Sequence, residues 1–427
     1  MIRRFFSSKP SKQKTPLPLE GLRVLEMGQL IAGPFAGCIL GYFGAEVIKI
    51  EPPVTGDALR NWRILDEGGT SYWWRSMGRN KKCITVNLKK QRGRDIVHSL
   101  ILKSDVVLEN FRPGTMEKYG MGPDKYLDSH PELIYTRVSG YGQTGPKKDL
   151  PGFASACEGY GGFRYLNGYP NEAPVRPNLS IGDTLAAMNA VIGTLVALQA
   201  KKVNNGLGQV VDVSIYESVF GMLEGVVPEF DGAGVIREPS GTTVTGIAPT
   251  NTYKCSDDVH IVIGGNGDSI FKRLCAAMNR NDLGNDERLI DNAGRVKHQQ
   301  EVDDAIRLWT NSLPSAKILD MLDEAGVPNG PINSIKDIME DEHFIARGMF
   351  EEVDLDKEEY HVDGMHKKRV TAKKKIKISA MVPKLNGTPG MTKYGGKKLG
   401  HHNIDVLENL LGFTENERLQ LEKDGVI

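Results

Sequence analysis

One carboxylate stands where a polar loop meets a long apolar helix. Asp183 lies in the stretch LSIGDTLAAMN (179–189), at the start of an apolar run that continues to about residue 201. An aspartate at such a place can cap the helix by accepting backbone N–H bonds. It can also act as a nucleophile, because aspartate is capable of covalent catalysis and the helix dipole keeps its carboxylate ionised. The residues alone leave both hypotheses open.

Other familiar catalytic and ligand-binding patterns do not occur in the sequence. There is no zinc-ligand spacing, HExxH, GxSxG or Walker A motif, and GGNGDSI (264–270) lacks the third glycine of a dinucleotide fingerprint. We therefore predict no metal site and no tightly bound cofactor. The densest run of charge, from His366 to Lys377, contains seven Lys or Arg residues. Such a run is typical of a solvated edge, and polyphosphate binding is the alternative.

The elements that must position Asp183 alternate between strand and helix. Residues 22–27 and 46–50 predict strands on either side of a helix from Pro34 to Phe43, which makes a βαβ unit. The pattern repeats with strands at 83–88, 105–110 and 133–142 and a helix at 90–103. Such alternation predicts an α/β fold with a doubly wound parallel sheet. Ligands of these sheets bind at the carboxyl ends of the strands, where this sequence is rich in Gly, Pro and polar residues.

The second half of the chain is predicted in less detail. We expect a helix over 184–201, a strand and helix over 208–220, a strand, turn and helix over 260–278, and one amphipathic helix over 301–325. Residues 228–250 are rich in Gly, Pro and Thr and predict a loop, so a domain boundary is expected there.

Length and composition set the broad class. A chain of 427 residues is too long for one small core and predicts two or three domains. The 54 basic and 54 acidic side chains give no net charge, which argues against a protein that coats nucleic acid. Five dispersed cysteines without CxxC spacing fit a reducing compartment better than a disulfide scaffold.

The amino-terminal segment has a composition of its own. Residues 1–19 hold five basic residues and no acid, which is typical of a mitochondrial presequence, with a disordered basic tail as the alternative. We therefore predict a presequence over residues 1–18 and a mitochondrial matrix location. Residues 28–45 carry no charge but contain five glycines and Pro34. They predict a glycine-rich loop and buried helix, so no membrane association is expected.

Seven motifs occur in an order that is typical of one family. They are LEGLRVLEMGQLIAGPFAGCILGYFGAEVIKIE (19–51), GDALRNW (56–62), GRNKKCITVNLK (78–89), DVVLENFRPGTMEKYG (105–120), SGYGQTGP (139–146), GVPNGPI (326–332) and LGHHN (399–403). Together they resemble the class III CoA-transferases, the CaiB/BaiF family, over nearly the whole chain. The resemblance implies a large CoA-binding domain beginning at 19–225, a linker and small middle domain at 226–340, and a return segment at 341–427 that completes the large domain. It also implies interlocked homodimers.

The resemblance also implies an activity and its nucleophile. Family members move CoA between carboxylic acids, and their covalent nucleophile is the aspartate that here is Asp183. Attack on an acyl-CoA would form a mixed anhydride and then an enzyme–CoA thioester. Water must be kept away from the anhydride, and backbone N–H groups must hold the oxyanion. The loop Gly264, Gly265, Asn266 and Gly267 resembles the glycine loop that covers the active site in the family.

Further residues are implied to bind CoA by their match to family motifs. They are Gln29, Leu30, Ile31 and Ala32 after the first strand, Val86 and Lys89 after the next, and Asn110, Phe111 and Lys118 after the third. The first group is expected to offer backbone N–H groups to phosphate near a helix N-terminus. Arg60 is expected to hold either substrate or a loop.

Two departures from the family pattern bear on these expectations. Pro52 replaces an arginine that many members place after the second strand, and Gly152-Phe153-Ala154 replaces Gly-Tyr-Asp. The related α-methylacyl-CoA racemases carry a histidine base where Phe153 stands, and phenylalanine cannot accept a proton. Transfer is therefore favoured over epimerisation, and a non-catalytic acyl-CoA-binding protein is the other alternative.

A mitochondrial address within this family indicates succinyl-CoA as donor and a free carboxylic acid, expected to be a dicarboxylate, as acceptor. A second carboxylate needs a cation, for which Arg60, Arg75 and Arg164 are candidates by residue type.

Overall fold

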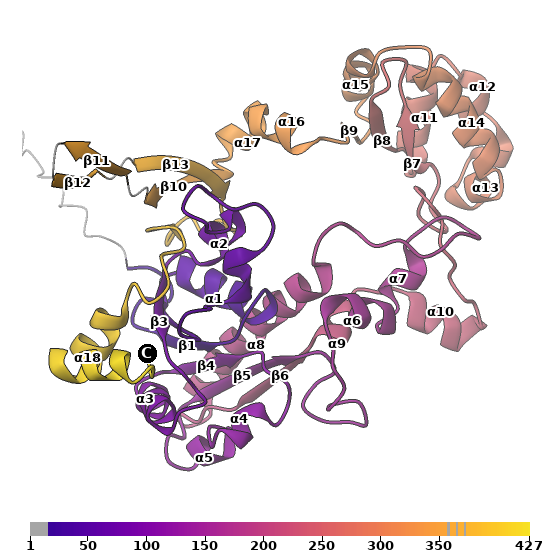
Figure 1. The fold of residues 1–427 in the computed structure, drawn as a ribbon. Coiled ribbons are helices and arrows are strands. Elements are labelled where there is room, and N and C mark those ends of the chain that lie inside the picture. Colours follow the sequence, from indigo (N-terminus) through magenta and orange to yellow (C-terminus); the bar gives the residue numbers. More distant parts are fainter. Residues whose placement is uncertain (1–15, 357–358, 364–365, 371–372) are drawn as a thin grey trace, which may run out of the picture. The chain divides into compact units, whose positions relative to one another are not determined.

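The computed structural model describes residues 16–427 apart from 357–358, 364–365 and 371–372 (Figure 1). The chain divides into two compact units. Unit 1 holds the described residues through 161 together with 180–221 and 348–427, and unit 2 holds 162–179 and 222–347. The expected presequence, residues 1–18, lies outside the described residues except for its last three. Residues 162–179, which we expected in the large domain, belong to unit 2.

Unit 1 is built on a six-stranded parallel sheet with the order β3-β2-β1-β4-β5-β6. Its strands are β1 (Arg23–Met27), β2 (Glu46–Glu51), β3 (Lys81–Thr85), β4 (Val106–Glu109), β5 (Ile134–Ser139) and β6 (Val210–Ser214). The strand order reverses between β1 and β4, which is the switch point where doubly wound sheets bind ligands. The predicted doubly wound parallel sheet is confirmed.

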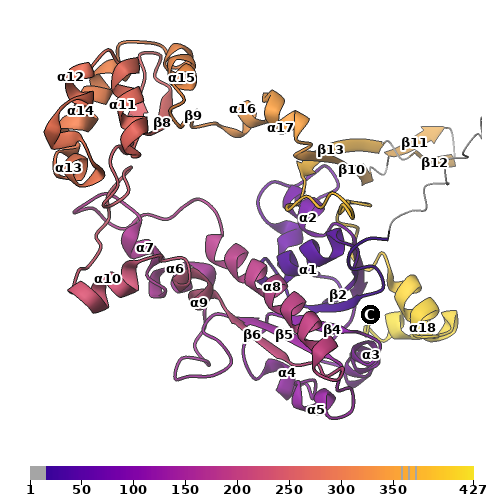
Figure 2. The same cartoon turned by 180° about the vertical axis from the view of Figure 1, so that it is seen from behind.

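Both faces of this sheet are covered by helices. Successive side chains of a strand point to opposite faces, and neighbouring residues of β1 and β4 are therefore buried in two different core clusters. On one face, Val24 and Val106 pack among residues of α1 (Ala32–Tyr42) and α8 (Ile181–Val203), which Figure 2 shows in front of the strands. On the other face, Leu25 and Val107 pack among residues of α3 (Gln91–Ile101). The other helices here are η1 (Ala58–Asn61), α2 (Tyr72–Met77), α4 (Thr115–Lys118), α5 (Asp124–Leu127), α6 (Ala154–Tyr160) and α9 (Ile215–Phe220).

The carboxyl-terminal part of the chain closes the edge of the sheet at β3. The Cys83 N–H donates to Nδ1 of His402 (3.0 Å), and the His402 N–H donates to the Cys83 carbonyl (3.0 Å). The Thr85 N–H donates to Oδ1 of Asn403 (2.9 Å). These bonds satisfy backbone groups that an open edge strand would leave unpaired. The elements of this part are β10 (Phe350–Asp356), β11 (Glu359–Asp363), β12 (His366–Val370), β13 (Lys373–Ser379), the π-helix η3 (Asp405–Leu410) and α18 (Glu415–Lys423).

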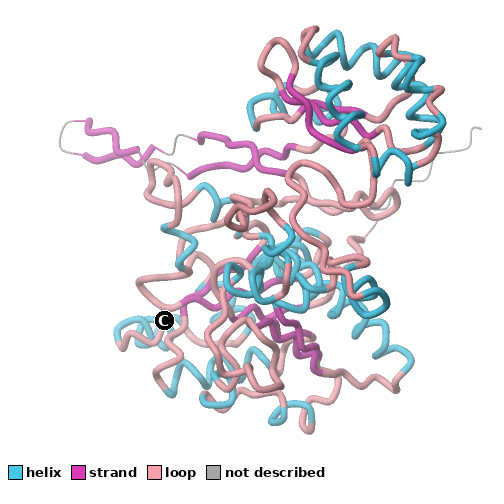
Figure 3. Tube along the Cα trace, turned by 90° about the vertical axis from the view of Figure 1, so that its right-hand side faces the viewer, coloured by secondary structure: helices cyan, strands magenta, loops and turns pink. Residues whose placement is uncertain are grey.

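Unit 2 has a small antiparallel sheet with the order β7-β8-β9 and a core of its own (Figure 3). The strands are β7 (Thr250–Lys254), β8 (His260–Gly264) and β9 (Asn329–Pro331). Its helices are α7 (Phe163–Leu166), α10 (Val226–Ala233), α11 (Asp268–Ala277), α12 (Asn281–Gly284), η2 (Glu287–Leu289), α13 (Asn292–Lys297), α14 (Gln299–Thr310), α15 (Ser315–Glu324), α16 (Ile335–Glu340) and α17 (Glu342–Ala346).

Two sequence predictions for unit 2 are wrong. The single helix expected over 301–325 is two helices, α14 and α15, because Pro314 has extended backbone and lacks the N–H that a continuous helix needs. Helix α10 forms in part of the stretch expected as loop. Its proline, Pro228, lies in the first turn, where no N–H is required, and Gly234 ends the helix in the left-handed conformation.

Two apolar segments of unit 1 bear on the question of a membrane. Residues 28–45, which we expected to be a loop and buried helix, contain the buried helix α1. Helix α8 is long and apolar enough to span a bilayer by length and composition, with 39% of its most apolar window buried. The buried residues of α8, such as Ala186 and Ala190, pack in the core beside the sheet.

Candidate active site

A pocket of about 250 Å³ lies at the carboxyl ends of strands β1 to β4, at the switch point of the sheet. Its lining residues are Met27, Gly28, Gln29, Ile50, Glu51, Pro52, Val86, Asn87, Leu88, Lys89, Phe111, Thr115 and Tyr119. Four residues expected to bind CoA therefore lie around one cavity: Gln29, Val86, Lys89 and Phe111. Lys118 is exposed on α4, the helix whose first residue, Thr115, lines the pocket.

The loop after β1 is held by side chains from other segments. The Gln29 N–H donates to Oδ1 of Asn110 (3.0 Å), and Nδ2 of Asn110 donates back to the Gln29 carbonyl (3.0 Å). A Cβ on Gly28 would lie 1.9 Å from Oδ1 of Asn110, so a larger residue there would displace the Asn110 side chain from its bonds to Gln29. Asn110 therefore fixes the shape of this loop.

Asp57 holds the next residue of the loop. Leu30 has a φ of +68°, a left-handed conformation that non-glycine residues rarely adopt, and its N–H donates to Oδ1 of Asp57 (3.0 Å). Two N–H groups that we expected to meet phosphate, those of Gln29 and Leu30, are thus used within the protein. Ile31 is the N-cap of α1 and Ala32 its first residue. The N–H groups of a first helical turn have no intrahelical acceptor, so this end of the loop fits the phosphate hypothesis better.

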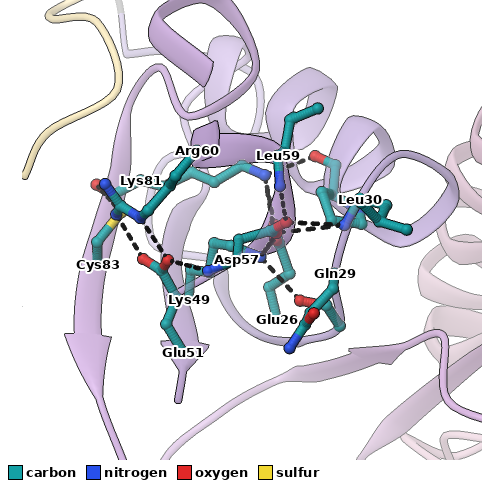
Figure 4. Close-up of polar contacts among 12 residues, drawn as sticks. Glu26, Gln29, Leu30, Lys49, Glu51, Asp57, Leu59, Arg60, Lys81 and Cys83 are labelled. Atoms are coloured by element: carbon teal, nitrogen blue, oxygen red, sulfur yellow. Dashed lines mark hydrogen bonds and ion pairs between the residues drawn. The ribbon is translucent and has the colours of Figure 1, made fainter. Parts of the chain in front are cut away.

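Asp57 belongs to a buried cluster of three carboxylates and three cations (Figure 4). Nζ of Lys49 lies 2.9 Å from both Oε1 of Glu26 and Oδ2 of Asp57, and it donates to the Gly28 carbonyl (2.8 Å). Lys81 also pairs with Glu26, at 2.8 Å. Burial alone would lower the pKa of Lys49, but the charges of Asp57, Glu26 and Glu51 outweigh burial and raise it. Lys49 is therefore a buried cation that holds the loop through its bond to the Gly28 carbonyl.

Arg60 completes this cluster. Its Nε and Nη2 donate to the two carboxylate oxygens of Glu51 (2.6 and 2.7 Å), and its guanidinium lies 3.9 Å from the Trp74 ring centroid. Nη1 donates to the Lys397 carbonyl (2.9 Å). This geometry favours the hypothesis that Arg60 holds a loop rather than substrate.

The other two arginines lie apart from the pocket lining. Arg75 is buried and bonded to Asp66 (2.8 Å) and to the Gly396 carbonyl (2.9 Å), so its guanidinium also serves the fold. Arg164 lies in α7, in unit 2.

Asp183 lies in the first turn of α8 and is partly exposed. The helix begins at Ile181 with Ser180 as N-cap, so Asp183 is not the capping residue itself. The Gly182 N–H donates to Oε1 of Glu158 (3.1 Å), a side chain with no exposed surface. A Cβ on Gly182 would lie 3.0 Å from Ile215, the first residue of α9 after strand β6. The turn that carries Asp183 is therefore fixed at the carboxyl end of the sheet.

Cys157 lies near Asp183, and Tyr141 lies near Cys157 in a group of three tyrosines. Burial, followed by the charge of Asp183, raises the pKa of Cys157 to about 11, so its thiol stays protonated and is no competing nucleophile at neutral pH. The rings of Tyr141, Tyr160 and Tyr216 lie 5.3–6.0 Å apart between centroids. Sequence reasoning missed Glu158 and two of these tyrosines, and only the SGYG motif pointed to Tyr141. It also missed Asp57, although the quoted motif GDALRNW contains it.

The glycine loop lies in unit 2, whereas Asp183 lies in unit 1. Gly264 ends β8 and Gly267 is the N-cap of α11. A Cβ on Gly265 would lie 2.7 Å from Cδ2 of Leu274, so a larger residue there would require the Leu274 side chain to shift.

Comparison with known proteins identifies the family. A model of CoA-transferase family III matches residues 19–403. The chain belongs to CoA-transferase family III. The succinyl-CoA–D-citramalate CoA-transferase of Chloroflexus aurantiacus is 42% identical over 417 residues, which are 98% of this chain and 100% of that protein. The succinyl-CoA:glutarate CoA-transferase of Mus musculus is 32% identical, over 79% of this chain and 77% of that protein.

A solved structure agrees with this assignment. A CaiB/BaiF family protein from Brucella suis has a TM-score of 0.78 and 28% identity, covering 92% of this chain and 100% of that one. The motif resemblance to the class III CoA-transferases is thus confirmed, and the protein is a family III CoA-transferase. The individual roles of Asp183, the CoA-binding residues and the glycine loop in this transferase stay predictions.

Proposed function

We propose that this transferase moves CoA from succinyl-CoA to a free dicarboxylic acid of the citramalate or glutarate kind, with Asp183 as nucleophile. The observation that carries the proposal is the setting of Asp183, a partly exposed carboxylate on a helical turn fixed by buried Glu158. The names of the relatives support the choice of substrates, since those proteins are described as succinyl-CoA-dependent transferases.

The proposed reaction balances without an external energy source. An oxygen of Asp183 bonds to the thioester carbonyl carbon of succinyl-CoA, and the C–S bond breaks to release CoA thiolate. The thiolate attacks the aspartyl carbonyl of the resulting anhydride, which releases succinate and leaves CoA on Asp183 as a thioester. The acceptor carboxylate then attacks the carbonyl carbon of this thioester, which breaks the C–S bond and forms a second anhydride. The released CoA thiolate attacks the acceptor carbonyl of that anhydride, and the C–O bond to the Asp183 oxygen breaks. Asp183 is regenerated as a carboxylate, and no proton is gained or lost.

Mass spectrometry of CoA esters tests the proposal. Purified protein would be incubated with succinyl-CoA and a mixture of mono- and dicarboxylic acids, alongside Asp183→Asn. The matched control is Asp124→Asn, which alters an exposed carboxylate in the first turn of α5. We expect new CoA esters of dicarboxylates with the parent and with Asp124→Asn, and none with Asp183→Asn. Esters formed by Asp183→Asn would overturn the nucleophile, and epimerisation of a 2-methylacyl-CoA without any transfer would favour the racemase alternative.

We also propose that the amino-terminal segment directs the protein to mitochondria and that the enzyme is a homodimer. The first rests on the basic, acid-free composition of residues 1–18, and the second on family membership. A reporter carrying residues 1–25 should enter mitochondria, and a diffuse cytosolic signal would contradict this. Light scattering of the purified protein should give twice the mass of one 47.0 kDa chain.

A further inference from the structure

Arg295 of α13 has no exposed surface and lies in the core of unit 2. Its Nε donates to the Ala248 carbonyl (3.0 Å) and its Nη1 to the Leu289 carbonyl (3.1 Å). Nη2 donates both to the Asn266 carbonyl and to Oδ1 of Asp268, each at 2.7 Å. The planar guanidinium uses its rigid fork to join three segments of unit 2.

One of these segments belongs to the glycine loop. The Asn266 carbonyl is part of the loop, and Asp268 directly follows it. The segment on the other side is tied to the loop as well, because the Gly265 N–H donates to the carbonyl of Pro249, the residue after Ala248. One buried cation therefore sets the conformation of Gly264–Gly267 from both sides.

The ion pair between Arg295 and Asp268 differs from an ordinary buried ion pair in the exposure of its carboxylate. The Asp268 side chain remains 61% exposed although its partner Arg295 is fully buried. Nη2 of Arg295 thus bonds to an exposed carboxylate next to the loop. Its bonds to the Ala248 and Leu289 carbonyls hold the same guanidinium in the core. An apolar side chain of similar volume could fill the space but has no N–H group to donate to the Asn266 carbonyl.

We infer that Arg295 is a positioning residue for the glycine loop, and that it keeps water away from the aspartyl intermediates. The inference rests on the proposed function and on the resemblance of this loop to the loop that covers the active site in the family. If the loop moves, water bonds to a carbonyl carbon of the anhydride and the C–O bond to the bridging oxygen breaks. Succinate and the Asp183 carboxylate are then formed, and the net reaction is succinyl-CoA and water giving succinate, CoA thiol and one proton.

The test compares Arg295→Lys and the milder Asp268→Asn with Tyr253→Phe in the full-length protein. The control removes a buried hydroxyl bond to Asp303 (2.6 Å) in the same unit, on strand β7. The first measurement is amide hydrogen exchange of peptides covering residues 260–270. The second is the ratio of succinyl-CoA hydrolysis to CoA transfer.

We expect faster exchange in the loop peptides and a hydrolysis-to-transfer ratio that rises roughly tenfold in Arg295→Lys, less in Asp268→Asn and not at all in Tyr253→Phe. Loop exchange equal to that of the control would overturn the positioning role. Faster exchange with an unchanged ratio would overturn the protection from water. If the parent protein transfers no CoA at all, the proposed function fails, while the exchange measurement still decides whether Arg295 positions the loop.

Discussion

At the scale of single residues, Asp57 shows how one buried carboxylate can serve several parts of a site. It accepts the N–H groups of Leu30 and Leu59, and it pairs with Lys49. Burial opposes its ionisation, but the charge of Lys49 and the hydrogen bonds from Lys49, Leu59 and Leu30 together outweigh burial and hold the pKa of Asp57 below its usual value. The loop beside the pocket therefore depends on a charged side chain that is not among the residues lining that pocket.

Asp57→Asn removes that charge while leaving the side chain almost the same size. We expect the free energy of unfolding to fall by about 3–5 kcal/mol, because Lys49 is left buried without one of its counter-charges. Urea denaturation measures this loss. Asp95→Asn, an exposed carboxylate on α3, is the control and should change the free energy by less than about 0.5 kcal/mol. Equal effects of the two substitutions would contradict the role of the buried cluster.

His402 makes stability depend on pH. Burial and neighbouring His401 lower the pKa of His402 to about 4, and its Nδ1 accepts the Cys83 N–H, so the folded protein holds it neutral. The unfolded chain has a higher histidine pKa of about 6.5 and binds the proton first. Its contribution to stability is therefore complete above about pH 6.5 and is lost as the pH falls towards 4.

His402→Asn keeps an acceptor near the Nδ1 position but does not titrate. We expect the parent to lose more stability than this variant when the pH falls from 7 to 5, as measured by urea midpoints at each pH. Carboxylates that do not interact with His402, such as Glu46, are common to both proteins and cancel in the comparison. Parallel stability curves for the two proteins would show that His402 is not the group responsible.

At the scale of elements, the edge strand β3 depends on a segment that follows it by more than 300 residues. Asn403 accepts the Thr85 N–H and donates to the Thr85 hydroxyl (2.9 Å each). Thr85 ends β3 and is followed by Val86, which lines the pocket. The segment that pairs with the sheet edge thus also fixes the start of a pocket wall.

Asn403→Ala leaves the Thr85 N–H without its acceptor. We expect a loss of about 1–3 kcal/mol in the free energy of unfolding, because an unsatisfied buried donor keeps its full desolvation penalty. Asn403→Asp retains an oxygen acceptor and should lose less. Thermal and urea unfolding of both variants would check the order, and a greater loss in Asn403→Asp would contradict it.

At the scale of the whole molecule, the last residues of the chain support the pocket. The Asn87 N–H donates to the Val426 carbonyl (2.7 Å), and its Nδ2 donates to the Gly425 carbonyl (3.3 Å). The side chains of Val426 and Ile427 are buried in the same core cluster as residues of β1, β2 and α3. A pocket formed at the start of the chain is therefore completed by its end.

A chain that ends at Gly425 tests this connection. We expect weaker CoA binding, because the backbone N–H of Asn87 loses the Val426 carbonyl as its acceptor. The pocket wall from Val86 to Lys89 then becomes mobile. We also expect a loss of roughly 2–5 kcal/mol of stability from two buried aliphatic side chains. Calorimetric titration with CoA measures the first effect, and Val406→Ala, a core substitution on η3, controls for stability alone. Unchanged CoA affinity in the shortened chain would show that this end serves only the fold.

The sequence by itself determined the family, the parallel sheet and most of its elements. Local periodicity specifies strands and helices, and ordered motifs such as SGYGQTGP specify a family. It also placed Gln29, Val86, Lys89 and Phe111, which now line one pocket, because strand ends of a parallel sheet meet at one edge.

Only the tertiary structure decided which side chains were free for such roles. Arg60 and Arg75 looked like substrate cations by type, but each is bonded to a buried carboxylate nine residues earlier in the chain, Glu51 and Asp66, and no local pattern in the sequence predicts either pair. The N–H groups of Gln29 and Leu30 looked available, but Asn110 and Asp57 accept them. A hydrogen bond or ion pair depends on distance in space, and residues distant in sequence acquire such distances only when the chain folds.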